Sequence, residues 1–128
     1  MNTRIIMTTS AIFLAIIGIS LTFFPVEIAN YLNIGFQSLL ILTLQVMGGL
    51  FFGFAMLNWM TKDSVIGGIY NKPLVTANMA QFMVGGLALL KDLIHHPDKP
   101  AIIWVVTGFY VIFGLVFVIL FMRSPVKG

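Results

Sequence analysis

Four long apolar segments, separated by short polar stretches, dominate the sequence. They cover residues 5–24, 38–60, 73–90 and 101–122, and none of them contains a charged side chain. Each is close to the roughly 20 residues that an α-helix needs to cross a hydrocarbon core about 30 Å thick. Because short connections favour antiparallel neighbours, the pattern predicts an all-α fold, an integral membrane antiparallel four-helix bundle in a single domain over residues 1–128.

The first connection contains the signals of an additional short helix. Pro25 follows the first apolar segment and suits the first turn of a helix, and Glu27 suits the positive N-terminal end. Gly35 is a residue type that commonly ends a helix. Residues 26–33 are therefore expected to form a short helix at the membrane surface, although a plain loop explains the same residues.

The composition excludes a soluble fold. Hydrophobic residues make up 59% of the 128 residues and charged residues 9%, whereas soluble domains contain about 45–50% apolar and about 25% charged residues. The net charge of +3 is scattered along the chain, so nucleic acid, which needs a clustered basic surface, is not an expected partner. The absence of cysteine excludes disulfides, thiol redox chemistry and cysteine-ligated metals.

The basic residues predict how the chain is oriented. Four spans place both termini on one side of the membrane, together with the connection between the second and third spans. That side carries Arg4, Lys62, Lys72, Arg123 and Lys127, whereas the other side carries only Lys91 and Lys99. Basic residues accumulate on the cytoplasmic side of membrane proteins. The sequence therefore predicts cytoplasmic termini in a cell membrane, the inner membrane of a bacterium.

Small residues on the second segment predict a helix-packing face. Gly49 and Gly53 are four residues apart, and small residues allow neighbouring helices in a membrane to approach closely. The residues on their face, at alternating spacings of three and four, are Gln45, Gly49, Phe52, Met56 and Trp59. Asn58 lies about 140° around the helix from Gln45 and near the end of the segment, so it is expected to reach the lipid headgroups.

Amide side chains on the third segment form a second candidate face. Its members, again at spacings of three and four, are Asn78, Gln81, Gly85, Ala88 and Asp92. Amides inside a membrane are costly without hydrogen-bond partners, so this face is expected to point into the bundle. It would either line a small polar pocket or hold helices together. The candidate ligand-binding or packing residues are Gln45, Gly49, Gly53, Asn78, Gln81 and Gly85.

The sequence indicates neither a catalytic site nor a metal site. The connection after the third segment contains Asp92, His95, His96 and Asp98. Zinc needs three or four such ligands in tetrahedral geometry, and nothing in this connection, which prolines and lysines surround, fixes that geometry. A solvated turn is therefore expected. The spans also lack the buried acid on which proton-coupled transporters depend.

Two stretches resemble a known family. Residues 23–27 have the sequence Phe-Phe-Pro-Val-Glu, and residues 44–53 have the sequence Leu-Gln-Val-Met-Gly-Gly-Leu-Phe-Phe-Gly. With the apolar fourth segment, this pattern resembles the DoxX-like superfamily of small four-helix membrane proteins and its uncharacterised relatives. The resemblance implies a four-helix membrane fold. Some members look like membrane subunits of oxidoreductase complexes that use quinones, but no catalytic motif is matched here.

Three functions remain open at this point. The first is a non-enzymatic membrane subunit or lipid-like-ligand-binding bundle without a cofactor, whose partners are membrane lipids and a membrane protein or a second copy of the chain. The second is a membrane component of a quinone-linked oxidoreductase, with quinone as the cofactor. The third is a small-molecule channel or transporter, which the lack of charge in the spans disfavours.

Overall fold

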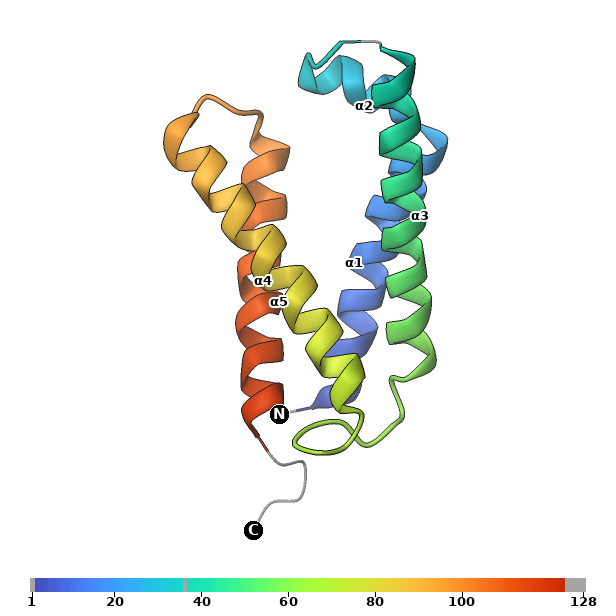
Figure 1. Ribbon diagram of the computed structural model, residues 1–128, viewed down its shortest axis with the longest axis vertical. Helices are drawn as coiled ribbons and strands as arrows, with labels where there is room; N and C mark the ends of the chain where they lie inside the picture. Colours follow the sequence, from blue (N-terminus) through green and yellow to red (C-terminus); the bar gives the residue numbers. More distant parts are fainter. Residues whose placement is uncertain (1, 36, 124–128) are drawn as a thin grey trace. The chain divides into compact units, whose positions relative to one another are not determined.

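The computed structural model describes residues 2–35 and 37–123, and the chain is helical throughout most of this part. The helices are α1 (Thr3–Phe23), α2 (Pro25–Leu32), α3 (Ser38–Met60), α4 (Lys72–His95) and α5 (Ala101–Met122) (Figure 1). No strand occurs in the described residues, where β-pairing is limited to an isolated bridge between Gly67 and Tyr70. The four longer helices are long and apolar enough to cross a membrane. The prediction of an all-helical fold with four spans is confirmed.

The helix ends follow the signals in the sequence with two exceptions. The short helix predicted over residues 26–33 is present as α2, which spans Pro25–Leu32 and carries Glu27 in its first turn. Asn33, rather than Gly35 as expected, ends it in the left-handed conformation, with φ 57°. The second exception is α4, which continues past residue 90 to His95. Its last turn lies beyond the apolar segment, so Lys91 and Asp92 belong to a helix end rather than to a loop.

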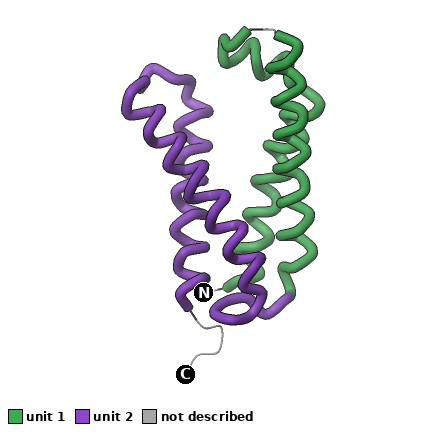
Figure 2. Tube along the Cα trace, in the orientation of Figure 1, with its two compact units in different colours: residues 1–63 green, residues 64–128 purple. Residues whose placement is uncertain are grey.

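The chain forms two compact units, residues 1–63 and residues 64–128 (Figure 2). In the first unit α1 packs along α3, and in the second α4 packs along α5. Figure 1 shows each pair side by side as a helical hairpin. Each hairpin is antiparallel, because residues early in one helix contact residues late in the other. The prediction of a single domain stays a prediction.

A close glycine contact positions α1 against α3 in the first unit. A Cβ atom added at Gly18 would lie 2.8 Å from the carbonyl oxygen of Gly48. One added at Gly48 would lie 2.7 Å from the carbonyl oxygen of Gly18 and 2.9 Å from the amide nitrogen of Thr22. These obstacles are backbone atoms, which cannot rotate away. Only glycine therefore allows the two helices to approach this closely.

The buried face of α3 differs from the expected one by a single residue. Its buried residues are Leu44, Gly48, Ala55 and Asn58. A Cβ at Gly49 or Gly53 would meet nothing within 4 Å, so Gly48 rather than these glycines makes the close contact with α1, and the packing face predicted at Gly49 and Gly53 stays a prediction. One residue corresponds to about 100° around a helix. Because α3 is apolar on every side and has adjacent glycines at 48 and 49, its sequence alone does not select the face.

The short helix α2 packs at the far end of the same hairpin. Ala29 is fully buried and joins Leu21 of α1 and Leu44 of α3 in a small core. Partly buried apolar side chains pack against this core, namely Ile17, Ile28, Ile41 and Phe51. The cluster holds α2 against the two long helices, so α2 is part of the packed unit.

Aromatic stacking organises the second unit. Phe82 of α4 is fully buried, and its ring centroid lies 5.2 Å from those of Tyr110 and Phe113 and 5.8 Å from that of Phe117, all on α5. The Tyr110 ring meets Phe82 edge-on, a favoured geometry for aromatic pairs. These contacts set the register of α4 against α5 and determine which polar groups meet between them.

Candidate functional site

The candidate site lies where Gln81 of α4 meets Tyr110 of α5. The Gln81 Nε2 atom donates a hydrogen bond to the Tyr110 hydroxyl oxygen at 3.0 Å. Tyr110 is buried and Gln81 is partly buried. Both residues lie well inside the apolar part of their helices, where polar groups are costly unless they are paired. The hydrogen bond therefore joins α4 and α5 within the apolar segments of both helices.

Gly85 makes room for the tyrosine ring. A Cβ added at Gly85 would lie 2.6 Å from Cε2 and 3.0 Å from Cδ2 of Tyr110, whereas one at Gly86 would make an ordinary contact, 3.7 Å from Cβ of Tyr110. The ring therefore rests directly on the backbone of α4, one turn beyond Gln81. This placement brings the phenolic oxygen within reach of the Gln81 amide. Of the residues predicted on this face, the structure thus brings Gln81 and Gly85 together.

One atom of the site lacks a hydrogen-bond partner. Gln81 Oε1 is buried, and no donor among the described residues reaches it. A buried polar atom without a partner costs about 1–3 kcal/mol in mutational data, and the cost is higher in hydrocarbon. The Gln81 amide therefore uses its nitrogen to hold Tyr110 and leaves its oxygen buried without a hydrogen bond.

Asn78 contributes to the helix rather than to this pair. Its side chain is fully buried, and Nδ2 donates to the carbonyl oxygen of Leu74, one turn earlier, at 3.1 Å. The prediction that Asn78 points inward agrees with this burial. Its role as a ligand-binding residue stays a prediction.

The sequence did not identify Tyr110 as part of the site. Tyr110 and Thr107 carry the only hydroxyl groups of residues 101–122. Because so few polar side chains are available in this segment, these two could have been predicted as partners for the α4 amides. Thr107 donates to the carbonyl oxygen of Ile103 at 2.7 Å, within its own helix. Of the two hydroxyls, Tyr110 is therefore the one that reaches Gln81.

The first unit contains a second buried polar pair. Asn58 is fully buried and its Nδ2 donates to Ser10 Oγ at 3.0 Å, while Ser10 Oγ donates to the Met7 carbonyl at 3.0 Å. The expectation that Asn58 reaches the headgroups is wrong. Ser10 of α1 offers a partner inside the hairpin, and an internal hydrogen bond satisfies the amide without any extension toward the membrane surface.

The remaining candidates, Gln45, Gly49 and Gly53, belong to α3 in the first unit. Gln45 is exposed, and its Nε2 donates to the carbonyl oxygen of Thr22 at 3.3 Å, across the α1–α3 contact. Gly49 and Gly53 are open around the Cβ position. Their assignment to a ligand-binding face stays a prediction.

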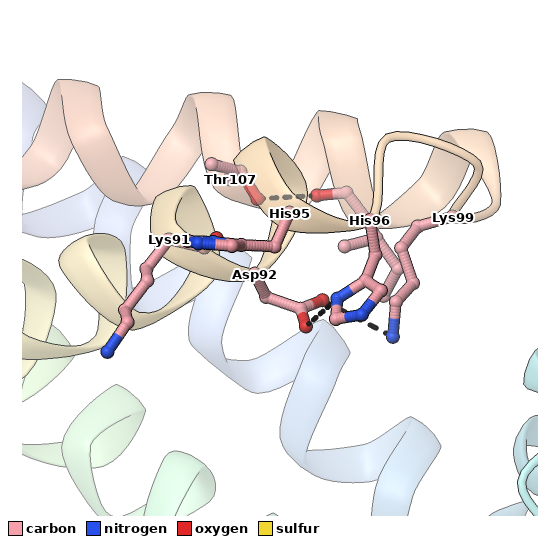
Figure 3. Close-up of polar contacts among 7 residues, drawn as sticks. Lys91, Asp92, His95, His96, Lys99 and Thr107 are labelled. Atoms are coloured by element: carbon pink, nitrogen blue, oxygen red, sulfur yellow. Dashed lines mark hydrogen bonds and ion pairs between the residues drawn. The ribbon is translucent and has the colours of Figure 1, made fainter.

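The turn between α4 and α5 holds an ion-pair cluster rather than a converging ligand set (Figure 3). Asp92 accepts hydrogen bonds from His96 Nδ1 and Lys99 Nζ, each at 3.3 Å. His95 instead places Nδ1 2.9 Å from the carbonyl oxygen of Lys91, whose side chain extends away from Asp92 in Figure 3. Within residues 2–35 and 37–123, no group of three or more histidine or acidic side chains could hold a metal ion.

Comparison with protein-family models, with curated proteins and with solved structures gave no match. The resemblance to the DoxX-like superfamily is therefore tested by none of them and stays a prediction.

Proposed function

We propose that the protein is a non-enzymatic membrane protein that holds a lipid-like molecule at the Gln81–Tyr110 site, alone or as a subunit of a larger membrane assembly. The observation that carries the proposal is the buried Oε1 atom of Gln81, which accepts no hydrogen bond from the described residues. A protein that needed this amide only to join two helices could use both of its polar atoms for that purpose. The remaining acceptor favours a bound molecule that supplies the missing donor.

The chemistry of the spans supports a binding role over a catalytic one. Their polar side chains are amides and hydroxyls, none of which serves as a general acid or base at neutral pH without activation. Several hydroxyls are engaged with their own helix backbone: Thr9 donates to Ile5 O at 2.8 Å, Thr43 to Leu39 O at 2.8 Å and Thr107 to Ile103 O at 2.7 Å. These hydroxyls therefore bond within their own helices.

The alternative role in a quinone-linked oxidoreductase depends on the proposed relationship to the DoxX-like superfamily. An oxidised quinone presents carbonyl oxygens, which accept hydrogen bonds. The unpartnered atom of Gln81 is itself an acceptor, whereas the second hydrogen of Gln81 Nε2 is the group that could donate to such a carbonyl. A purified sample that carries a bound quinone whose absorbance changes on reduction would favour this alternative.

We further propose a bacterial inner membrane with both termini in the cytoplasm. Within the first unit, Arg4 pairs with Asp63 at 3.1 Å, so the start of α1 and the end of α3 lie at one end of the hairpin. Within the second, Lys72 lies 5.2 Å from the Phe121 ring, so the start of α4 and the end of α5 also share an end. These ends carry the basic residues that remain cytoplasmic. A reporter fused after Gly128 is expected to be active in the cytoplasm, and activity only outside it would contradict the assignment.

The test of the binding function compares lipids that remain with the purified protein. Wild type, Gln81→Leu and Gln37→Leu are purified in mild detergent, and the retained lipids are identified by mass spectrometry. Gln37 is exposed at the start of α3 and makes no side-chain cap, so it is a matched control for the same chemical change. Wild type and Gln37→Leu are expected to retain a lipid-like molecule that Gln81→Leu loses while its helicity is unchanged. Identical lipid content in all three proteins would contradict the proposal.

A further inference from the structure

The connection before α4 ends in a closed turn, which belongs to the second unit. The backbone amides of Gly67 and Tyr70 each donate to the carbonyl oxygen of the other residue, at 3.1 and 3.0 Å. Gly67 and Gly68 have positive φ angles of 125° and 60°, which glycine adopts without steric cost. Asn71 Nδ2 donates to the carbonyl oxygen of Val65 at 2.6 Å and closes the base of the turn. These hydrogen bonds give the turn a defined shape.

The turn presents large apolar side chains on its outer side. Ile66 is buried, whereas Ile69 at the tip is 82% exposed, Val65 55% and Tyr70 46%. A single exposed apolar residue is ordinary on a protein surface, but turns consist mainly of glycine, proline, asparagine, aspartate and serine. Three large exposed side chains within residues 65–70 form an apolar patch, and such patches mark contacts with a protein or a membrane.

The length of the chain places this patch beside the membrane surface. The membrane-spanning helix α4 begins at Lys72, three residues after Ile69. Even a fully extended chain would keep Ile69 within about 11 Å of that helix start. The headgroup layer on each side of the hydrocarbon core is about 5–8 Å thick. The tip of the turn is therefore within reach of the lipid that surrounds the start of α4.

The residues next to the turn favour phospholipid as the partner of this patch. Lys72 Nζ lies 5.2 Å from the ring centroid of Phe121, at the end of α5. Among the described residues no acidic side chain pairs with Lys72, so its ammonium group is available to a lipid phosphate. Tyrosine is enriched at the boundary between lipid and water, and Tyr70 carries the only aromatic ring of the turn.

We propose that the turn over residues 65–70 is an anchor that inserts into the phospholipid surface from which α4 starts. Ile69 contacts the upper acyl chains, Tyr70 lies among the headgroups and Lys72 meets their phosphate groups. The anchor fixes the depth of the second unit in the membrane. It is separate from the Gln81 site and requires no ligand there.

The absence of cysteine from the sequence makes a single introduced spin label specific to one position. Full-length Ile69→Cys and Asp98→Cys are each labelled with a nitroxide and placed in phospholipid nanodiscs. Asp98 is exposed in the turn at the other end of α4, so it controls for any tendency of the label itself to enter lipid. Power-saturation electron paramagnetic resonance then measures how often each label collides with oxygen, which concentrates in lipid, and with a water-soluble nickel chelate.

The ratio of oxygen to nickel collisions is expected to be severalfold higher at Ile69→Cys than at Asp98→Cys. Equal ratios would place the tip in water and overturn the proposal. Few collisions with either reagent at Ile69→Cys would show that protein covers the tip, either the first unit or a second copy of the chain, and would overturn it as well.

A second label position leaves Ile69 in place. A nitroxide at Val65→Cys is expected to show the same preference for oxygen, and Ile69→Asp in that background should lower the ratio toward that of Asp98→Cys. The backbone hydrogen bond from Asn71 to residue 65 is retained in this variant. A ratio at Val65→Cys that does not change with Ile69→Asp would show that Ile69 does not anchor the turn.

Discussion

The adjacent glycines of α3 allow a direct test of the packing in the first unit. Gly48→Ala places a Cβ 2.7 Å from the Gly18 carbonyl oxygen and 2.9 Å from the Thr22 amide nitrogen. Real Cβ atoms essentially never come this close to other atoms, so the α1 and α3 backbones must separate. Gly49→Ala, one residue later in the same helix, meets nothing within 4 Å. The two substitutions are chemically identical and differ only in their surroundings.

The magnitude follows from two terms. Replacing glycine by alanine inside a helix favours folding by up to about 1 kcal/mol, and this term is the same at both positions. Overpacking at Gly48 adds a cost of about 1–3 kcal/mol. Gly48→Ala is therefore expected to be about 1–3 kcal/mol less stable than Gly49→Ala, whereas Gly49→Ala should equal or exceed wild type in stability.

The two tryptophans make the assay specific to one unit. Trp59 lies in the first unit and Trp104 in the second, so a Trp104→Phe background restricts fluorescence to the first. Unfolding in mixed micelles of increasing denaturing detergent then gives the free energy of unfolding for each variant. If Gly49→Ala proves as destabilising as Gly48→Ala, the assignment of the close contact to Gly48 is refuted.

Two further predictions concern the polar and glycine contacts. Gly85→Ala should displace the Tyr110 ring, whose Cε2 atom lies 2.6 Å from the added Cβ, and destabilise the second unit by about 1 kcal/mol. The control Gly108→Ala has open space around the new methyl group, so equal Trp104 unfolding curves for both variants would count against the predicted ring position. For the buried pair in the first unit, a double-mutant cycle of Ser10→Ala and Asn58→Leu should give a coupling of about 0.6 kcal/mol, the average for hydrogen bonds in membranes. Additive effects would show that the hydrogen bond contributes nothing to stability.

The number of the long helices and most of their ends were predictable because they depend on local composition. Uninterrupted apolar runs need a helix to satisfy their backbone in a membrane, and prolines or charges end each run, although α4 continues through Lys91 and Asp92 to His95. The short helix α2 was predictable for the same reason, since Pro25 and Glu27 are local signals of a helix start.

The packing faces were less predictable because they depend on the partner helix. Glycines at 48 and 49 offer two adjacent faces of α3, and only Gly18 of α1 determines which of them is used. The prediction for Asn58 was wrong for the same reason, since its hydrogen-bond partner is Ser10 of another helix. In the second unit the sequence predicted an inward polar face with Gln81, but the register that brings Tyr110 to it depends on the phenylalanine contacts of Phe82.

The central claim is that Gln81 holds a lipid-like molecule, and native mass spectrometry of the intact protein tests it most directly. Wild type, released from mild detergent, is expected to show one bound lipid-like molecule per chain that survives gentle activation. The same adduct should appear in Gln37→Leu and be absent from Gln81→Leu. A wild-type spectrum without any retained adduct, or an adduct of equal abundance in Gln81→Leu, would contradict the account.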